Sequence, residues 1–161
     1  KNMGPAGVTM VIIRDNLIGR SGRDLPAMLD FAMHADKDSM FNTPPVFAIY
    51  VVNRTLHWLK ALGGVESMQV QNKSKAKFLY DEIERNPLFT SPILVEDRSL
   101  MNVPFIFANG GDEPHFLNYC TERGLLTLKG HRSVGGFRAS IYNAMPKEGV
   151  EALVDAMQNY T

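Results

Sequence analysis

The segment 129–143 constrains the fold more than any other part of the chain. It reads KGHRSVGGFRASIYN, so the double glycine Gly135-Gly136 is followed by alternating apolar and polar residues. This alternation predicts a β-strand over residues 136–142, because successive side chains of a strand point to opposite faces. The double glycine allows a tight turn or a close backbone approach just before that strand.

Three basic side chains lie around this predicted turn. His131 and Arg132 come before it, and Arg138 follows it. Together they suit a small molecule with two anionic ends, since such side chains donate charged hydrogen bonds to carboxylate and phosphate. Solvated surface charge accounts for the same residues, and residue chemistry alone leaves both interpretations open.

Residues 86–161 are predicted to form an α+β unit, with helices on one face of a small, mostly antiparallel sheet. Asp112 is the expected N-cap of one helix and Gly124 closes it. Another helix begins near Pro146. The remaining strands are predicted over residues 93–96, 101–108 and 125–128, and the helix after Asp112 over residues 113–123.

Two helices are predicted upstream of this unit. Thr43 is the expected N-cap of the first, which should cover residues 46–62 and end at Gly63-Gly64. The second should cover residues 65–85, where apolar side chains recur with the spacing of one helix face. We expect the lysine and glutamate side chains of this second helix to form its solvated side.

Residues 8–14, VTMVIIR, are apolar at nearly every position and rich in β-branched side chains. Such a run predicts a strand buried on both faces, of the kind found in large sheets covered by helices. Little of the neighbouring sequence is available to cover such a sheet. Because the chain also begins at Lys1 without an initiator methionine, we expect it to be a fragment of a longer protein.

The charge balance excludes several classes of partner. The chain has 161 residues and no net charge, which argues against nucleic-acid or membrane-surface binding. Transmembrane and signal-peptide patterns are not found in the sequence.

The lone cysteine, Cys120, is expected to be a buried thiol, which fits a reducing, cytoplasmic setting. The four histidines lack the spacing of metal ligands, so no metal site is predicted.

Two other positions have residue types that suit cofactor chemistry. Lys1 stands next to a glycine-proline turn, and a lysine in a dry cleft can lose its proton and form an imine with a carbonyl. Asn42 and Thr43 precede a predicted helix, where amide, hydroxyl and backbone N–H groups suit a phosphate. A charged terminal residue and simple helix capping are the respective alternatives.

Taken in order, these segments resemble the phosphoserine aminotransferase family. The matching residues span the whole chain, and the last segment is the most specific. They are KN-x-GPAG at 1–7, VIIR at 11–14, NTPP at 42–45, WLK-x-x-GG at 58–64, RS-x-MNV at 98–103 and the segment 129–143. The resemblance implies an α/β fold, the C-terminal part of a pyridoxal-phosphate transferase of fold type I. Residues 1–64 would be the remnant of its large cofactor-binding domain, and residues 65–161 its small C-terminal domain.

The resemblance also implies a homodimer whose cofactor site is shared across the interface. Lys1 would bind the pyridoxal 5′-phosphate aldehyde and then move a proton at the substrate α-carbon, since a neutral amine is both nucleophile and base. Asn42 and Thr43 would reach the cofactor phosphate of the other subunit.

The substrate would be bound by the basic group of the segment 129–143. Arg138 would bind the α-carboxylate, and His131 with Arg132 would bind the side-chain phosphate. The implied reaction transfers an amino group reversibly between glutamate and 3-phosphohydroxypyruvate, giving O-phospho-L-serine and 2-oxoglutarate in serine biosynthesis. Members of the family also act in pyridoxine biosynthesis, on a phosphorylated hydroxythreonine intermediate.

Two other functions remain open at this point. One is a different fold type I transaminase or lyase, which would keep Lys1 without needing both His131 and Arg132 beside Arg138. The other is a non-enzymatic binding or oligomerisation domain that retains the small-domain fold.

The resemblance predicts that this 161-residue polypeptide by itself is inactive and binds cofactor poorly. In the family, the aromatic residue that stacks on the cofactor ring, the acid paired with the pyridine nitrogen and the glycine-rich phosphate loop all precede the lysine. A transamination assay on the isolated chain, verified by intact mass, tests this expectation. Measurable turnover by that chain would contradict it.

Overall fold

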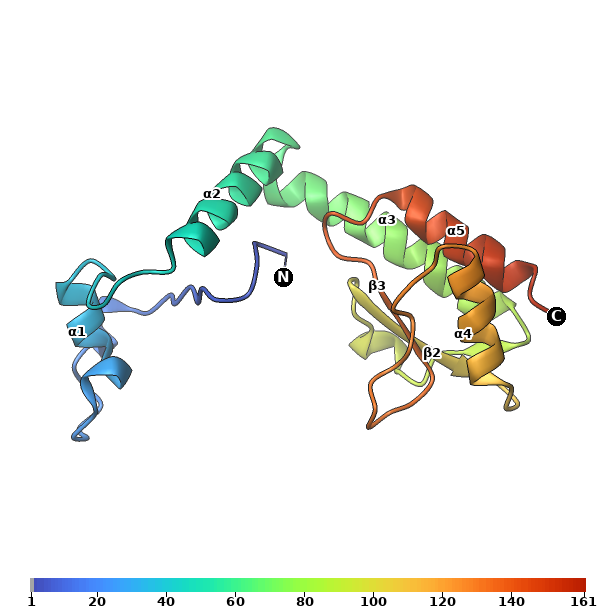
Figure 1. Cartoon of the computed structure of the whole chain (residues 1–161), viewed down its shortest axis with the longest axis horizontal. Coiled ribbons are helices and arrows are strands. Elements are labelled where there is room, and N and C mark those ends of the chain that lie inside the picture. The colour runs from blue at the N-terminus through green and yellow to red at the C-terminus, as the bar shows by residue number, and fades with distance from the viewer. Residues whose placement is uncertain (1) are drawn as a thin grey trace. The chain divides into compact units, whose positions relative to one another are not determined.

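The computed structural model describes residues 2–161, so Lys1 lies outside the described residues. The described chain divides into two compact units, which are Met3–Trp58 and Leu59–Thr161, with Asn2 grouped in the second (Figure 1). No helix of this described part is long and apolar enough to cross a membrane.

The first unit contains short helical turns and most of one long helix. Its elements are η1 (Asp15–Leu17), η2 (Ala27–Leu29), α1 (Phe31–Asp36) and α2 (Val46–Ala61), the last of which continues into the second unit. Asp30 caps α1, since its carboxylate accepts a hydrogen bond of 2.9 Å from the Ala32 N–H. This cap fixes the start of a helix that has only six residues.

The strand predicted over residues 8–14 is wrong. The segment forms no ladder with any described strand, and its Ile12 side chain is 95% exposed. A strand of this kind needs neighbours on both edges for its backbone groups and covering layers on both faces for its side chains. Residues 2–161 supply neither, so the apolar run stays unpaired and largely exposed.

Helix α2 begins and ends close to the predicted bounds, but its start differs in detail. The helix begins at Val46, and the Ile49 N–H donates to the carbonyl of Pro45 at 3.0 Å, so Thr43 lies before the capping position. Its buried residues are Ala48 and Val52. Gly4 allows the N-terminal segment to approach this face, because a Cβ there would lie 2.6 Å from Cγ2 of Val52.

The second unit is an α+β arrangement, as predicted. A three-stranded antiparallel sheet, in the order β1-β2-β3, is combined with three helices. The elements are α3 (Gly64–Arg85), β1 (Phe89–Thr90), η3 (Val95–Asp97), β2 (Asn102–Phe107), α4 (Glu113–Glu122), β3 (Phe137–Ser140) and α5 (Lys147–Gln158). In Figure 1, α3 and α5 run alongside each other, and both contribute residues to the core.

The core lies on one face of this sheet. Burial alternates along β2 and β3, so Phe105 and Phe137 are buried at paired positions. Their rings are 5.1 Å apart, and Phe116 of α4 contacts Phe137 edge to face at 4.8 Å. Each such aromatic pair contributes about 0.5–1.5 kcal/mol beyond the area that it buries.

The predicted strand over 101–108 and the helix capped by Asp112 are confirmed, whereas the strands over 93–96 and 125–128 are wrong. The first pairing occurs earlier, at Phe89–Thr90, and Val95–Asp97 form a 3-10 turn instead. Residues 125–128 form no ladder, because Thr127 has a left-handed φ of 62° that interrupts an extended run.

Cys120 is buried on α4, as predicted, and burial raises the pKa of its thiol to about 11. We expect Ellman's reagent to react with the folded chain at about pH 8 only as fast as the core opens, because the reactive form is the thiolate. The same chain in denaturant is the control and should react at once. Immediate reaction of the native chain would contradict this burial.

Candidate functional site

The loop before β3 is closed by hydrogen bonds between its own backbone groups. The Gly130 N–H donates to the Gly136 carbonyl at 2.8 Å, and the N–H groups of Val134 and Gly135 both donate to the His131 carbonyl at 2.9 Å. Glycine is required at both ends of this loop. A Cβ on Gly130 would lie 2.0 Å from the Gly135 oxygen, and one on Gly136 would lie 2.8 Å from the Phe105 oxygen.

His131 and Arg132 are exposed at the start of this loop. The Ser133 N–H donates to Nδ1 of His131 at 3.3 Å, and Oγ of Ser133 lies 2.7 Å from the same nitrogen. The other ring nitrogen, Nε2, has no hydrogen-bond partner in the part of the chain that the structure describes. Both side chains are therefore available to a ligand.

Arg138 lies on the face of the sheet opposite the aromatic core. It is paired in register with Pro104, and its backbone N–H donates to the Leu128 carbonyl at 2.7 Å. Its Nε is buried without a hydrogen-bond partner among residues 2–161, and no carboxylate in that range lies within ion-pair distance. An unpaired buried donor of this kind is costly, so the guanidinium fits an anionic ligand.

The structure brings three of the predicted site residues into one unit. His131, Arg132 and Arg138 belong to the same loop and strand of the second unit, whereas Asn42 and Thr43 belong to the first unit. Lys1 lies outside the described residues. The Asn42 and Thr43 side chains are exposed before α2, and the only hydrogen bond there runs from Nδ2 of Asn42 to the Thr43 carbonyl, at 3.1 Å, within the described chain. The Thr43 hydroxyl and the second amide N–H of Asn42, just before a helix N-terminus, fit a phosphate.

The expectation that the lysines and glutamates of α3 are solvated is wrong for two of them. Lys75 is 4% exposed and Glu82 is 2% exposed. Burial raises the pKa of the Glu82 carboxyl, but hydrogen bonds from Gln158, Asn86 and Arg85 outweigh that effect and hold it below its ordinary value. The signal was present in the sequence, since both residues lie on the same helical face as the buried Leu79.

Lys75 belongs to a polar cluster that sequence reasoning missed. Its Nζ donates to the carbonyls of Tyr142 and Met145 at 2.9 and 2.8 Å, and burial lowers the pKa of its ammonium. Nearby, Nδ2 of Asn72 donates to Oδ1 of Asn143 at 2.8 Å. These contacts join residues that are about 70 positions apart, so no local pattern predicts them.

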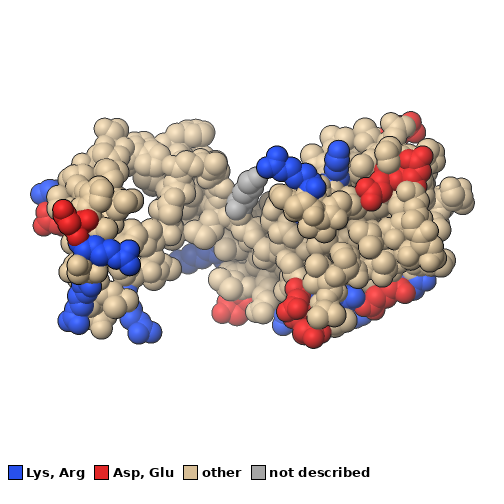
Figure 2. All heavy atoms as spheres, turned by 90° about the horizontal axis from the view of Figure 1, so that it is seen from below, with Lys and Arg blue, Asp and Glu red and all other residues tan. Residues whose placement is uncertain are grey.

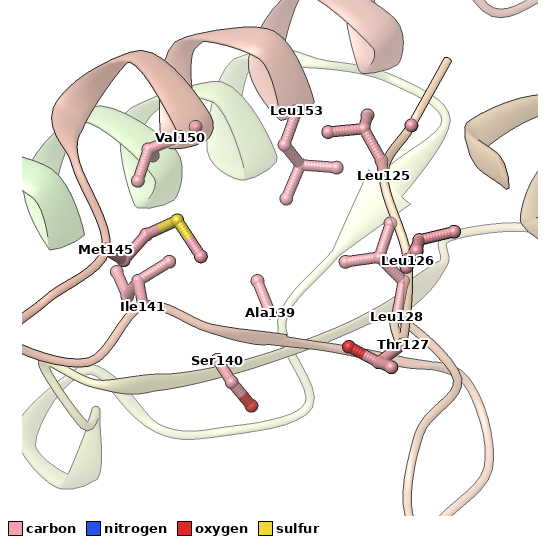
Figure 3. A pocket seen from close by; sticks show the side chains of 12 residues that line it. Leu125, Leu126, Thr127, Leu128, Ala139, Ser140, Ile141, Met145, Val150 and Leu153 are labelled. Atoms are coloured by element: carbon pink, nitrogen blue, oxygen red, sulfur yellow. The ribbon is translucent and has the colours of Figure 1, made fainter. Parts of the chain in front are cut away.

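An apolar cavity of about 210 Å³ lies elsewhere in the second unit, between α5, β3 and residues 125–128. Met145 and Leu153 point into it, whereas the hydroxyl of Ser140 points away (Figure 3). Because no charged side chain lines this cavity, it does not suit a doubly anionic ligand.

Acidic and basic side chains are interspersed over the face seen in Figure 2, without an extended basic patch.

Replacing Gly130 tests the closed loop. We expect Gly130→Ala to destabilise the second unit by about 1–3 kcal/mol more than Gly110→Ala, because its Cβ meets a carbonyl oxygen. Gly110 is a matched control, since it also lies in a loop and a Cβ at that position would meet nothing within 4 Å, although its φ of 76° carries its own cost. Equal losses in urea-induced unfolding would contradict the loop geometry.

Comparisons with known proteins show what the chain is similar to. The family described as Aminotransferase class-V matches residues 1–153. A phosphoserine aminotransferase from Azobacteroides pseudotrichonymphae is 54% identical over 162 residues, which is 99% of this chain and 45% of that protein. The chain therefore spans less than half the length of this relative.

Solved structures agree with these sequence comparisons. Phosphoserine aminotransferase from Bacillus circulans subsp. alkalophilus matches with a TM-score of 0.93 and 45% identity, covering 98% of this chain and 44% of that one. The enzyme from Trichomonas vaginalis with bound pyridoxal phosphate matches with a TM-score of 0.80 and 47% identity, covering 84% and 39% of the two chains. These likenesses confirm the predicted α/β fold class and the resemblance found in the sequence.

Proposed function

Because the chain belongs to the class-V aminotransferase family, we propose that the protein containing it is a phosphoserine aminotransferase. The reaction is reversible transfer of an amino group between glutamate and 3-phosphohydroxypyruvate, giving O-phospho-L-serine and 2-oxoglutarate for serine biosynthesis. The observation that carries this proposal is the 54% identity along almost the whole chain to a relative of that name. The grouping of three basic side chains around one loop gives it independent physical support.

The cofactor in this proposal is pyridoxal 5′-phosphate, which supplies an electron sink for chemistry at an amino-acid α-carbon. Lys1 is the residue that binds it covalently and moves the proton at that carbon, as a neutral amine can do. Asn42 and Thr43 bind its phosphate through their amide and hydroxyl groups.

Arg138 and the loop before β3 are the proposed substrate-binding residues. The guanidinium of Arg138 donates two parallel hydrogen bonds to the α-carboxylate, which its unpaired donor fits. His131 and Arg132 bind the phosphate of the substrate from the exposed end of the loop. Each charged hydrogen bond contributes about 1.5–3 kcal/mol, so the pair separates phosphorylated amino acids from ordinary ones.

The wider organisation is part of the same proposal. Residues 1–64 are the C-terminal remnant of a large cofactor-binding domain, and residues 65–161 are the small domain. The protein is a cytoplasmic homodimer in which Asn42 and Thr43 serve the cofactor phosphate of the other subunit.

The proposal is tested on a protein with the full length of its relatives. We expect that protein, loaded with cofactor, to convert O-phosphoserine and 2-oxoglutarate to glutamate, and to act far more slowly on serine or alanine. Release of glutamate, coupled to glutamate dehydrogenase, measures the rate. A preference for serine or alanine would indicate a transaminase of different specificity.

Arg132→Ala tests the phosphate assignment in the same protein. We expect kcat/KM for O-phosphoserine to fall about 10- to 100-fold, the equivalent of one lost charged hydrogen bond, with little change for serine. Arg123→Ala, which removes an exposed arginine at the end of α4, is the control. An equal loss with both substrates would contradict the phosphate role.

A further inference from the structure

Two buried polar side chains of α3 hold the loop that follows β3. Asn72 is 2% exposed and Lys75 is 4% exposed. The Lys75 ammonium donates to two backbone carbonyls of this loop, those of Tyr142 and Met145, while Asn72 donates to the side chain of Asn143. The loop is therefore fixed at both of its ends and in its middle.

Burying the Lys75 ammonium lowers the stability of the folded state. A buried ammonium loses its hydration, and no carboxylate among residues 2–161 lies within ion-pair distance of Lys75. An apolar side chain of similar length would avoid that cost. The lysine instead provides two hydrogen bonds, which have a defined direction and so fix the position of the Tyr142–Met145 backbone relative to α3.

The loop that follows β3 also contacts Asn2, near the start of the chain. The backbone N–H of Asn143 donates to Oδ1 of Asn2 at 3.1 Å, and Nδ2 of Asn2 lies 2.6 Å from the sulfur of Met101. Asn2 and both of these partners belong to the second unit. In the sequence it is the residue directly after Lys1. A continuous set of hydrogen bonds thus runs from α3 through the loop to the neighbour of the proposed cofactor lysine.

We propose that Asn2, Asn72 and Lys75 are positioning residues for the reaction at Lys1. The inference rests on the proposed function, because it takes Lys1 as the reacting amine. Asn72 and Lys75 hold the loop, the loop presents the Asn143 N–H, and that N–H fixes the chain at Asn2. In this role the three residues act through the backbone at Asn2, the residue next to the lysine, and not on the reacting atoms themselves.

The test uses the full-length, cofactor-loaded protein and the variants Asn2→Ala and Lys75→Met. Misplacing a reacting group by about 1 Å can cost about 100-fold in rate, so we expect kcat to fall about 10- to 100-fold while KM for O-phosphoserine changes little. Lys73→Met is the matched control, since Lys73 is exposed on the same helix two residues away. It should leave both constants unchanged.

A second readout does not depend on activity. Hydrogen exchange of the Asn143 amide should be faster in Asn2→Ala, and in Lys75→Met, than in the unaltered protein or in Lys73→Met. Should Lys75→Met fail to fold, Asn2→Ala alone decides, because Asn2 is only half-buried and its loss leaves the core intact.

The outcomes separate this inference from the proposed function. An unaltered protein without transaminase activity contradicts the proposed function. An active protein in which Asn2→Ala keeps its kcat, or raises only KM, contradicts the positioning role alone. Unchanged exchange of the Asn143 amide contradicts the hydrogen-bond connection itself.

Discussion

The pairing of β2 with β3 places one face of a small sheet against the helices, and the second unit depends on that register. Phe105 opposes Phe137, and both are buried with Phe116 in the aromatic core. The neighbouring pair, Pro104 and Arg138, must then face the other way. A slip of one residue would turn the arginine into the core and the phenylalanine out of it, so packing of the apolar face also sets the orientation of the basic one.

The same unit buries two charged side chains, Glu82 and Lys75. Glu82 is satisfied by three neighbouring side chains, and Lys75 by two carbonyls of a loop. Both are buried in positions where an apolar residue would avoid the loss of hydration. Hydrogen bonds have direction, however, and hydrophobic contacts do not. A loop held by directional contacts adopts one conformation, which matters if the chain at Asn2 must be placed for chemistry.

The helices were predicted more successfully than the strands, for a physical reason. The bounds of α2, α3 and α4 and the start of α5 follow from periodicity, glycine stops and the Asp112 cap, all of which are local, although Thr43 does not cap α2 as predicted. A strand exists only when a partner supplies its hydrogen bonds. Residues 8–14 have strand composition and no strand partner among residues 2–161, whereas Phe89–Thr90 is too short to stand out in the sequence and pairs with β2.

The sequence by itself determined the residue types of the candidate site and the glycines that shape its loop. His131, Arg132 and Arg138 are close in sequence, and Gly135-Gly136 permits the turn between them, so their grouping is a local property. Only the tertiary structure decided which side chains are buried and which loop they hold. The contact between Lys75 and the Tyr142–Met145 loop joins residues about 70 positions apart, and it depends on how α3 packs beside the end of β3. Such contacts follow from the packing of the whole unit, because no short-range pattern specifies which distant backbone groups a buried side chain will meet.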